Sequence, residues 1–183
     1  MRDTSVEGFT LEVAFDAPIE RVFETLTTFD RFEDYTDAAR IAVRGEGVGT
    51  RCYINLQKRV LDIPARYTVR AKLTEMEEPT KVGWEVTQDL DIWGGYELSE
   101  NEGETTIQLS FNIDLGDSDL DALPAPPGAS PEEIVQMVLP ALGSESSGIL
   151  RGLTEDIEGE PRKPKVTVRE SSTLFEDALQ EFF

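Results

Sequence analysis

The longest helical pattern in the chain, residues 130–158, limits the fold more than any other feature. Ser130 suits an N-cap, Pro131 suits the first helical position, and Glu133 completes a capping box. Apolar residues then recur at spacings of three, four and seven, which places most of them on one face: Ile134, Val135, Val138, Leu142, Ile149, Leu150, Leu153 and Ile157. A helix of this length and pattern is expected to close over a sheet.

The middle of this helical pattern is made of small residues, which do not fill the space beneath them: Gly143, Ser144, Ser146, Ser147, Gly148 and Gly152. We therefore predict a gap between the helix and the sheet, and our central hypothesis is that this gap is a ligand cavity. Pro140 lies inside the pattern and removes a backbone donor, so either a kink near residues 138–142 or two abutting helices is expected.

Strands with alternating polarity fill most of the chain before the helix. Short connections, including the hairpin signal Asn101-Glu102-Gly103, predict an antiparallel sheet. Residues 18–29 carry one apolar helix face, with Asp16 or Ala17 near the cap and Pro18 in the first turn, and residues 30–35 indicate a short second helix. The expected strands are residues 9–16, 39–44, 50–58, 64–74, 81–88, 92–99 and 104–115.

One side of these strands is apolar or aromatic. We predict a cavity lined by six residues from the strands and three from the long helix: Tyr67, Val69, Trp84, Tyr96, Leu109, Phe111, Val138, Leu142 and Ile149. Plain core packing is the competing interpretation of the same pattern. Trp93 alternates to the opposite side of the sheet or sits at a bend beside Gly94 and Gly95.

Residues able to do chemistry are scarce on that apolar side. The chain has no His and a single Cys, Cys52, which we expect to be a small buried core residue. We therefore predict no metal site and no cofactor, and no catalytic residue can be named. Gly45, Gly47 and Gly49 lack the strand-turn-helix setting of a dinucleotide fingerprint and indicate a turn instead.

The chain is strongly acidic, with 37 acidic and 17 basic side chains in 183 residues and a formal charge of −20. This balance argues against nucleic acid and anionic membranes as partners. An acidic surface poor in lysine is typical of an extreme halophile, where salt screens repulsion between like charges. No apolar run reaches transmembrane length and residues 1–8 do not resemble a signal peptide, so we expect no membrane insertion and a cytoplasmic location.

The last part of the chain, residues 159–183, is a separate feature of the pattern. Residues 159–165 indicate a linker, residues 166–169 an extended segment, and residues 172–183 a short amphipathic helix. A helix this short is marginal alone in water, so it must pack on something. Three roles stay open: docking on its own sheet, pairing with a second copy in a homodimer, or plugging the mouth of a cavity.

Three local features resemble the START-like superfamily, and within it the polyketide cyclase/dehydrase and lipid-transport branch, also called SRPBCC. They are the strand-to-helix entry at residues 13–23, the glycine turn at residues 45–51, and the long helix at residues 130–158. The resemblance covers residues 8–158 and implies an α+β helix-grip fold. In that fold a curved antiparallel sheet of about seven strands wraps around the long C-terminal helix and encloses an apolar cavity.

The resemblance and the residue pattern together favour a carrier or sensor that binds a small hydrophobic or aromatic molecule. A cyclase or dehydratase acting in the same cavity is the second hypothesis, and a buried polar cluster would distinguish it from the first. A co-chaperone-like interaction module that uses the tail helix or a sheet edge is the third.

Overall fold

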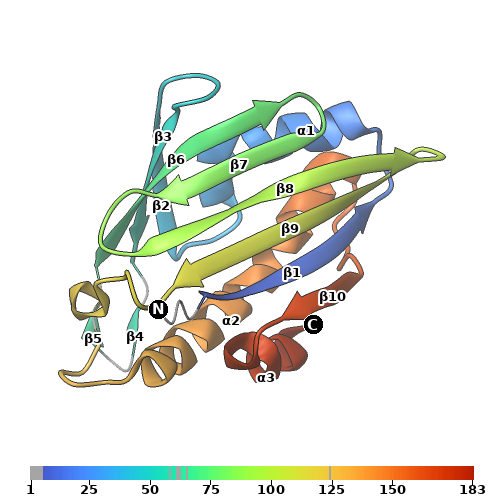
Figure 1. The fold of residues 1–183 in the computed structure, drawn as a ribbon. Coiled ribbons are helices and arrows are strands. Elements are labelled where there is room, and N and C mark those ends of the chain that lie inside the picture. The colour runs from blue at the N-terminus through green and yellow to red at the C-terminus, as the bar shows by residue number, and fades with distance from the viewer. Residues whose placement is uncertain (1–5, 58, 61–62, 65, 124) are drawn as a thin grey trace.

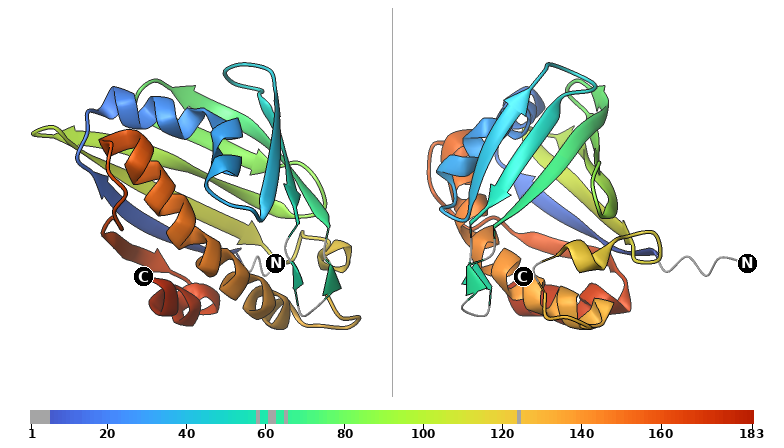
Figure 2. Two further views of the ribbon diagram at one scale, coloured as in Figure 1. Left: turned by 180° about the vertical axis from the view of Figure 1, so that it is seen from behind. Right: turned by 90° about the vertical axis from the view of Figure 1, so that its left-hand side faces the viewer.

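The structure is a computed structural model that describes residues 6–57, 59–60, 63–64, 66–123 and 125–183. For residues 59–60, 63–64, 138–144, 178 and 181–182 it describes the backbone only. The fold is α+β, as predicted: one curved antiparallel sheet carries helices on one of its faces (Figures 1 and 2).

The large sheet has eight strands in the order β10-β1-β9-β8-β7-β6-β3-β2, one more than the seven predicted, and β4 and β5 form a separate two-stranded pair. All of its strand pairs are antiparallel, as the short connections indicated. The strands are β1 (Val6–Phe15), β2 (Ala39–Arg44), β3 (Arg51–Leu56), β4 (Arg59–Val60), β5 (Ile63–Pro64), β6 (Tyr67–Glu77), β7 (Lys81–Val86), β8 (Asp91–Asn101), β9 (Glu104–Asp114) and β10 (Val166–Ser171).

The helical elements are α1 (Ile19–Thr27), the 3-10 helix η1 (Phe29–Asp34), the 3-10 helix η2 (Leu120–Ala122), α2 (Pro131–Glu158) and α3 (Thr173–Phe182). The expected second helix is thus η1, and the cap of α1 is Pro18, one or two residues later than predicted, because the Pro18 carbonyl accepts from the backbone N–H groups of Arg21 and Val22. The Gly45–Gly49 segment is a turn, with φ of 98°, 65° and 91° at Gly45, Gly47 and Gly49.

The long helix α2 lies across the sheet and begins as predicted (Figure 2). The Ser130 hydroxyl accepts from the Glu133 backbone N–H, and the Glu133 carboxylate accepts from the Ser130 backbone N–H. The helix is continuous from Pro131 to Glu158, so Pro140 does not divide it into two abutting helices. It ends at Gly159, which adopts the left-handed conformation with φ of 85°.

Two of the small residues in the middle of α2 make room for another part of the chain. A Cβ on Gly152 would lie 2.3 Å from the ring of Tyr35, and one on Gly148 would lie 3.3 Å from the Tyr35 carbonyl oxygen. Tyr35 directly follows η1, and its hydroxyl donates to the Asp156 carboxylate of α2 at 2.5 Å. At Gly148 and Gly152, therefore, the absent side chains make room for Tyr35, not for a ligand.

Replacing Gly152 by alanine is expected to lower the free energy of unfolding by about 1–2 kcal/mol, although alanine gains about 1 kcal/mol in helix propensity, because the added methyl group overlaps the Tyr35 ring. Gly148→Ala is the matched control, and it should be more stable than Gly152→Ala because its added methyl group approaches Tyr35 only to 3.3 Å, at the carbonyl oxygen. Urea unfolding measures both. Equal stability of the two variants would contradict this packing of Tyr35 on α2.

The inner face of the sheet carries two clusters of buried side chains. The first lies under α1 and the C-terminal half of α2 and includes Phe15, Val82 and Ile157. The second lies where β1 and β9 meet the tail, and it includes Leu11 and Phe175. The inner face therefore holds a packed core at each of these two places. A ligand site on this face would have to lie outside these two clusters.

The tail is integrated into the fold. β10 pairs with β1 and extends the sheet by one strand, with Phe9 opposite Ser171 and Val13 opposite Val166. α3 packs its buried Phe175 and Leu179 against the inner face of β1 and β9 (Figure 1). Of the three roles left open for the tail helix, docking on its own sheet is the one that the fold contains.

Candidate ligand-binding site

Cross-strand register determines which side chains share the inner face. Val13 pairs with Ile107, and Ile107 pairs with Leu98. These three side chains are buried, as are Leu73 and Val82. This end of the inner face is closed by packing.

The adjoining part of the inner face is equally apolar but only half-buried. This half-buried surface consists of Ile54, Leu56, Tyr67, Val69, Trp84, Val86, Ile92, Tyr96, Leu109 and Phe111. Register holds these residues side by side: Ile54 pairs with Val69, and Tyr96 pairs with Leu109. Apolar side chains on the helix-covered face of a sheet are normally fully buried, so their partial exposure distinguishes this region from the packed end.

Trp84 and Phe111 of the half-buried surface join Phe9 and Phe175 in a group of four aromatic rings. Gly94 separates Trp84 from Phe111 in register, and a Cβ on Gly94 would lie 2.7 Å from the indole of Trp84. The indole therefore lies across the glycine and approaches the Phe111 ring at a centroid distance of 6.2 Å. Phe9 stacks on Phe111 at 5.2 Å, and Phe175 of α3 meets both rings edge-on.

Two tyrosines give this apolar surface its polar groups. Burial raises the pKa of Tyr96 to about 12. Burial, followed by the carboxylate of Asp89, raises the pKa of Tyr67. Both hydroxyls are therefore protonated at neutral pH. The Tyr67 hydroxyl donates to the Asp89 carboxylate and keeps its oxygen as an acceptor, whereas the Tyr96 hydroxyl offers a donor.

Groups for acid-base or nucleophilic chemistry are sparse here. Burial raises the pKa of the Cys52 thiol, which keeps it protonated and unreactive, in agreement with the predicted core role. Glu7 is an inner-facing acid that the sequence analysis missed, because the predicted strand began at Phe9. It pairs with Ile113, and its Oε2 atom is buried and has no hydrogen-bond partner among the described residues. The only sequence signal for it is that Glu7 keeps the alternating register two residues before Phe9.

The structure places seven of the nine predicted lining residues on or against the inner face. Trp84 and Phe111 are brought into ring contact, Leu109 packs against the cluster that holds Phe175, and Tyr96 and Ile149 pack against the cluster under α1. Tyr67 and Val69 lie further along, on β6. The side chains of Val138 and Leu142 lie outside the described part of the structure.

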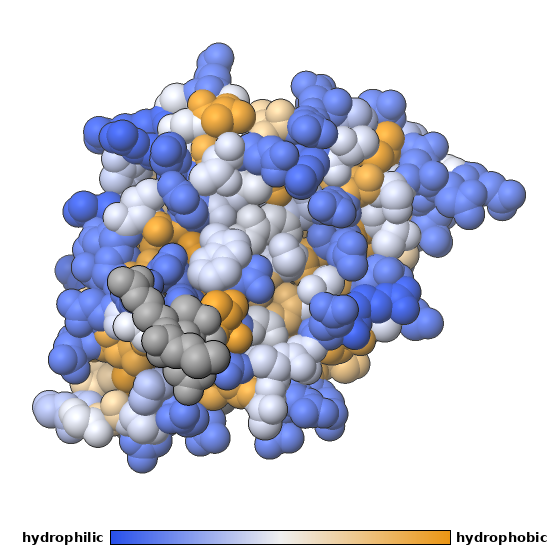
Figure 3. Space-filling view, in the orientation of Figure 1, coloured by the Kyte–Doolittle hydropathy of each residue, from blue (hydrophilic) through white to orange (hydrophobic). Residues whose placement is uncertain are grey.

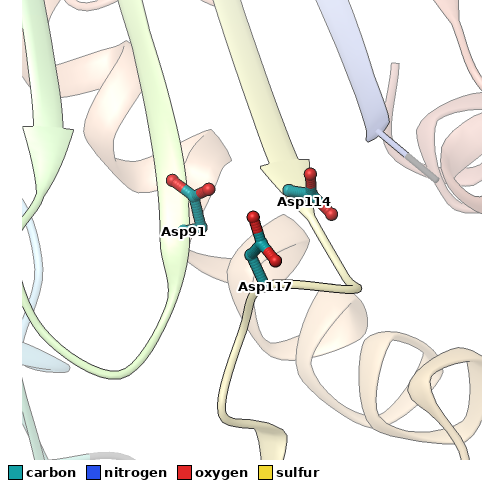
Figure 4. A group of neighbouring side chains, drawn as sticks. All are labelled: Asp91, Asp114 and Asp117. Carbon is teal, nitrogen blue, oxygen red and sulfur yellow. The ribbon is translucent and has the colours of Figure 1, made fainter. Parts of the chain in front are cut away.

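Three carboxylates gather at the end of β8 and β9, away from the half-buried surface. Asp91 and Asp114 are paired across the two strands, and Asp117 follows in the next loop (Figure 4). Their nearest oxygens lie within 4.8 Å of one another. The Asp114 carboxylate accepts from the Gly116 backbone N–H, and the Ser118 hydroxyl bridges the Asp114 carbonyl and the Asp91 N–H, so these residues also order the turn after β9.

A curved antiparallel sheet that holds a long C-terminal helix against an apolar inner face defines a helix-grip protein. The family described as polyketide cyclase/dehydrase and lipid transport matches residues 7–144, and the chain belongs to this family. No curated protein matches the chain. Within the part of the chain that the structure describes, no helix is long and apolar enough to cross a membrane.

Solved structures share the fold at low sequence identity. Ara h 8.0201 is 20% identical, with 85% of this chain and 97% of that chain covered and a TM-score of 0.57. The di-domain aromatase/cyclase StfQ of the steffimycin biosynthetic pathway is 14% identical, with a TM-score of 0.65; the match covers 86% of this chain and 52% of StfQ. The Zhui aromatase/cyclase from Streptomyces sp. R1128 is 14% identical, with 84% and 94% covered and a TM-score of 0.55.

Proposed function

We propose that this protein binds a small, neutral, apolar or aromatic molecule between the inner face of the sheet and α2, and that it acts as a carrier or sensor. The observation that carries the proposal is the half-buried surface, where ten apolar or aromatic side chains on the helix-covered face remain partly accessible. Burying such surface against a ligand contributes about 25 cal/mol per Å².

The residues around this surface suggest the shape and polarity of the ligand. The indole of Trp84, which is tilted against Phe111, offers an aromatic surface suited to packing on a ring system. The Tyr96 hydroxyl is a protonated donor that suits a carbonyl or hydroxyl oxygen on the ligand, and the Tyr67 oxygen, whose proton is directed at Asp89, can accept from a ligand hydroxyl. The ten residues of the half-buried surface include no basic side chain. A ligand with a charged carboxylate would therefore lose its hydration there without gaining an ion pair.

The proposed binding unit is residues 8–158, and residues 159–183 complete one wall of it. Phe175 supports the role of the tail as a wall, because its ring contacts Phe111 of the half-buried surface and Phe9 beside it. Leu174, Phe175 and Leu179, which a homodimer contact through α3 would use, pack against their own sheet.

Native mass spectrometry of the protein purified from a lysate tests the binding function. The expected result is a bound species of small mass that is released on denaturation. Leu109→Trp fills the half-buried surface and should abolish the bound species, whereas Arg70→Trp places the same indole at an exposed position on the outer face and should retain it. An empty wild-type protein, or equal occupancy in both variants, would refute the proposal.

A cyclase or dehydratase function in the same place is the second candidate. Two neighbours of similar fold are described as aromatase/cyclases. The inner face offers Tyr96 as a proton donor and Glu7 as an acid with an unpaired oxygen. The molecule recovered by mass spectrometry discriminates the two functions: an enzyme returns it chemically changed over repeated turnovers, and a carrier returns it unchanged.

A further inference from the structure

A hollow lies on the outer face of the sheet, and the proposed interior ligand does not use it. Its volume is about 390 Å³, and residues of β1, β6, β7, β8 and β9 line it. Figure 3 shows this face, where pale residues of intermediate hydropathy gather over the middle of the sheet. Trp93 forms part of the lining and is 37% exposed, which makes it one of the few large apolar side chains left open to solvent.

The hollow exists because small residues occupy one row across four neighbouring strands. Thr10 pairs with Ser110, Ser110 with Gly95, and Gly95 with Gly83. Two of these residues have no side chain and two have a short hydroxyl side chain, so the row forms a trough across the sheet. A single glycine would leave only a small depression in the sheet surface. Four small residues in one row leave a depression wide enough for a six-membered ring of a ligand.

Larger side chains stand on both sides of the trough. On one side Trp93 pairs with Asn112, and on the other Gln108 pairs with Glu97, which in turn pairs with Lys81. A flat indole therefore stands across a floor of small residues from a row of hydrogen-bonding groups. An aromatic platform opposite a few polar groups is the composition of a small-molecule site.

The polar groups of the hollow are mostly neutral and available. The side chains of Thr10, Gln108, Ser110 and Asn112 make no hydrogen bond to any other residue that the structure describes. Each amide offers both a donor and an acceptor, and each hydroxyl does the same. Lys81 is the only cation in the lining, and Glu75 engages it at 3.0 Å.

We propose that this hollow binds a neutral saccharide, with one sugar ring stacked on Trp93 and its hydroxyls hydrogen-bonded to Asn112, Gln108 and Ser110. A sugar ring has an apolar C–H face that suits an indole and a rim of hydroxyls that both donate and accept. The carboxylates of Glu75 and Glu97 and the net charge of −20 disfavour an acidic or phosphorylated ligand. Lys81 offsets the attraction of these carboxylates for a cation.

NMR titration of the isotope-labelled full chain with glucose, galactose and maltose tests the proposal. The indole N–H signal of Trp93 and the side-chain amide signals of Asn112 and Gln108 should shift on addition of at least one of these sugars. Glucuronate is the anionic control and should shift none of them. Trp93→Ala should weaken sugar binding about tenfold, and Trp93→Tyr should retain most of it.

A second variant tests the trough itself without touching the indole. Ser110→Leu fills the floor between the two walls and should also abolish binding, whereas Val48→Ala changes an exposed apolar residue at the distant β2–β3 turn and should leave it unchanged. Sugar affinity that stays at the wild-type value in both Trp93→Ala and Ser110→Leu would overturn the proposal. It would equally be overturned if no neutral sugar shifts these signals. Tetramethylammonium tests the alternative that Trp93 binds a cation on its indole face, and shifts with this cation but not with the sugars would also overturn the proposal.

Discussion

Replacing Phe175 by alanine is expected to lower the free energy of unfolding by about 3–5 kcal/mol, the range for truncating a buried phenylalanine. Phe175 is 4% exposed, and its ring meets Phe9 at 5.3 Å and Phe111 at 5.8 Å. The loss of these contacts leaves a cavity between α3 and the sheet that the surrounding strands are too rigid to close. Urea unfolding followed by far-UV circular dichroism measures the change.

Phe183 provides the control within the same tail, since it follows α3 and is 37% exposed. Phe183→Ala should change the free energy of unfolding by less than about 0.5 kcal/mol. If the two alanine variants were equally stable, α3 would not be docked on the sheet in solution. The tail would then be available for a partner, as the interaction-module hypothesis requires.

Much of the fold followed from local patterns in the sequence. The two-residue alternation of β1, β6 and β9 and the capping box at Ser130 each lie within a few residues, so the sequence alone specifies them. The inward or outward direction of side chains followed as well: Trp84 and Tyr96 lie on the inner face, and Trp93 on the outer face. These are the features for which local periodicity and burial agree.

Features that depend on contacts distant in sequence were not predictable in the same way. The small residues of α2 predicted a gap, but Tyr35 occupies the space at Gly148 and Gly152, more than 100 positions away along the chain. The role of the tail was left open, because pairing of β10 with β1 joins residues 166–171 to residues 9–13. The trough on the outer face depends on register across four strands, and no single stretch of sequence contains it.

Contacts distant in sequence also explain why replacing either of two inner-facing valines by phenylalanine is expected to change the free energy of unfolding by different amounts. Val82 lies in the packed cluster under α1 and is 1% exposed, whereas Val69 lies in the half-buried surface. Val82→Phe should lower the free energy of unfolding by about 1–3 kcal/mol or more, because the added atoms have no space. If the proposed ligand space is open, Val69→Phe should change it by less than about 1 kcal/mol, because the added ring enters that space.

Ligand binding to the same two variants is a second test of whether the inner face is open or packed. N-phenyl-1-naphthylamine, a neutral aromatic fluorophore, should bind wild type and Val82→Phe with similar affinity, provided that the latter is measured under conditions where it is folded. Its affinity for Val69→Phe should fall about tenfold or more, because the new ring takes the space of the ligand. If Val69→Phe instead destabilises the protein as much as Val82→Phe and leaves the affinity unchanged, the inner face is packed throughout. The proposed ligand would then have no place between the sheet and α2.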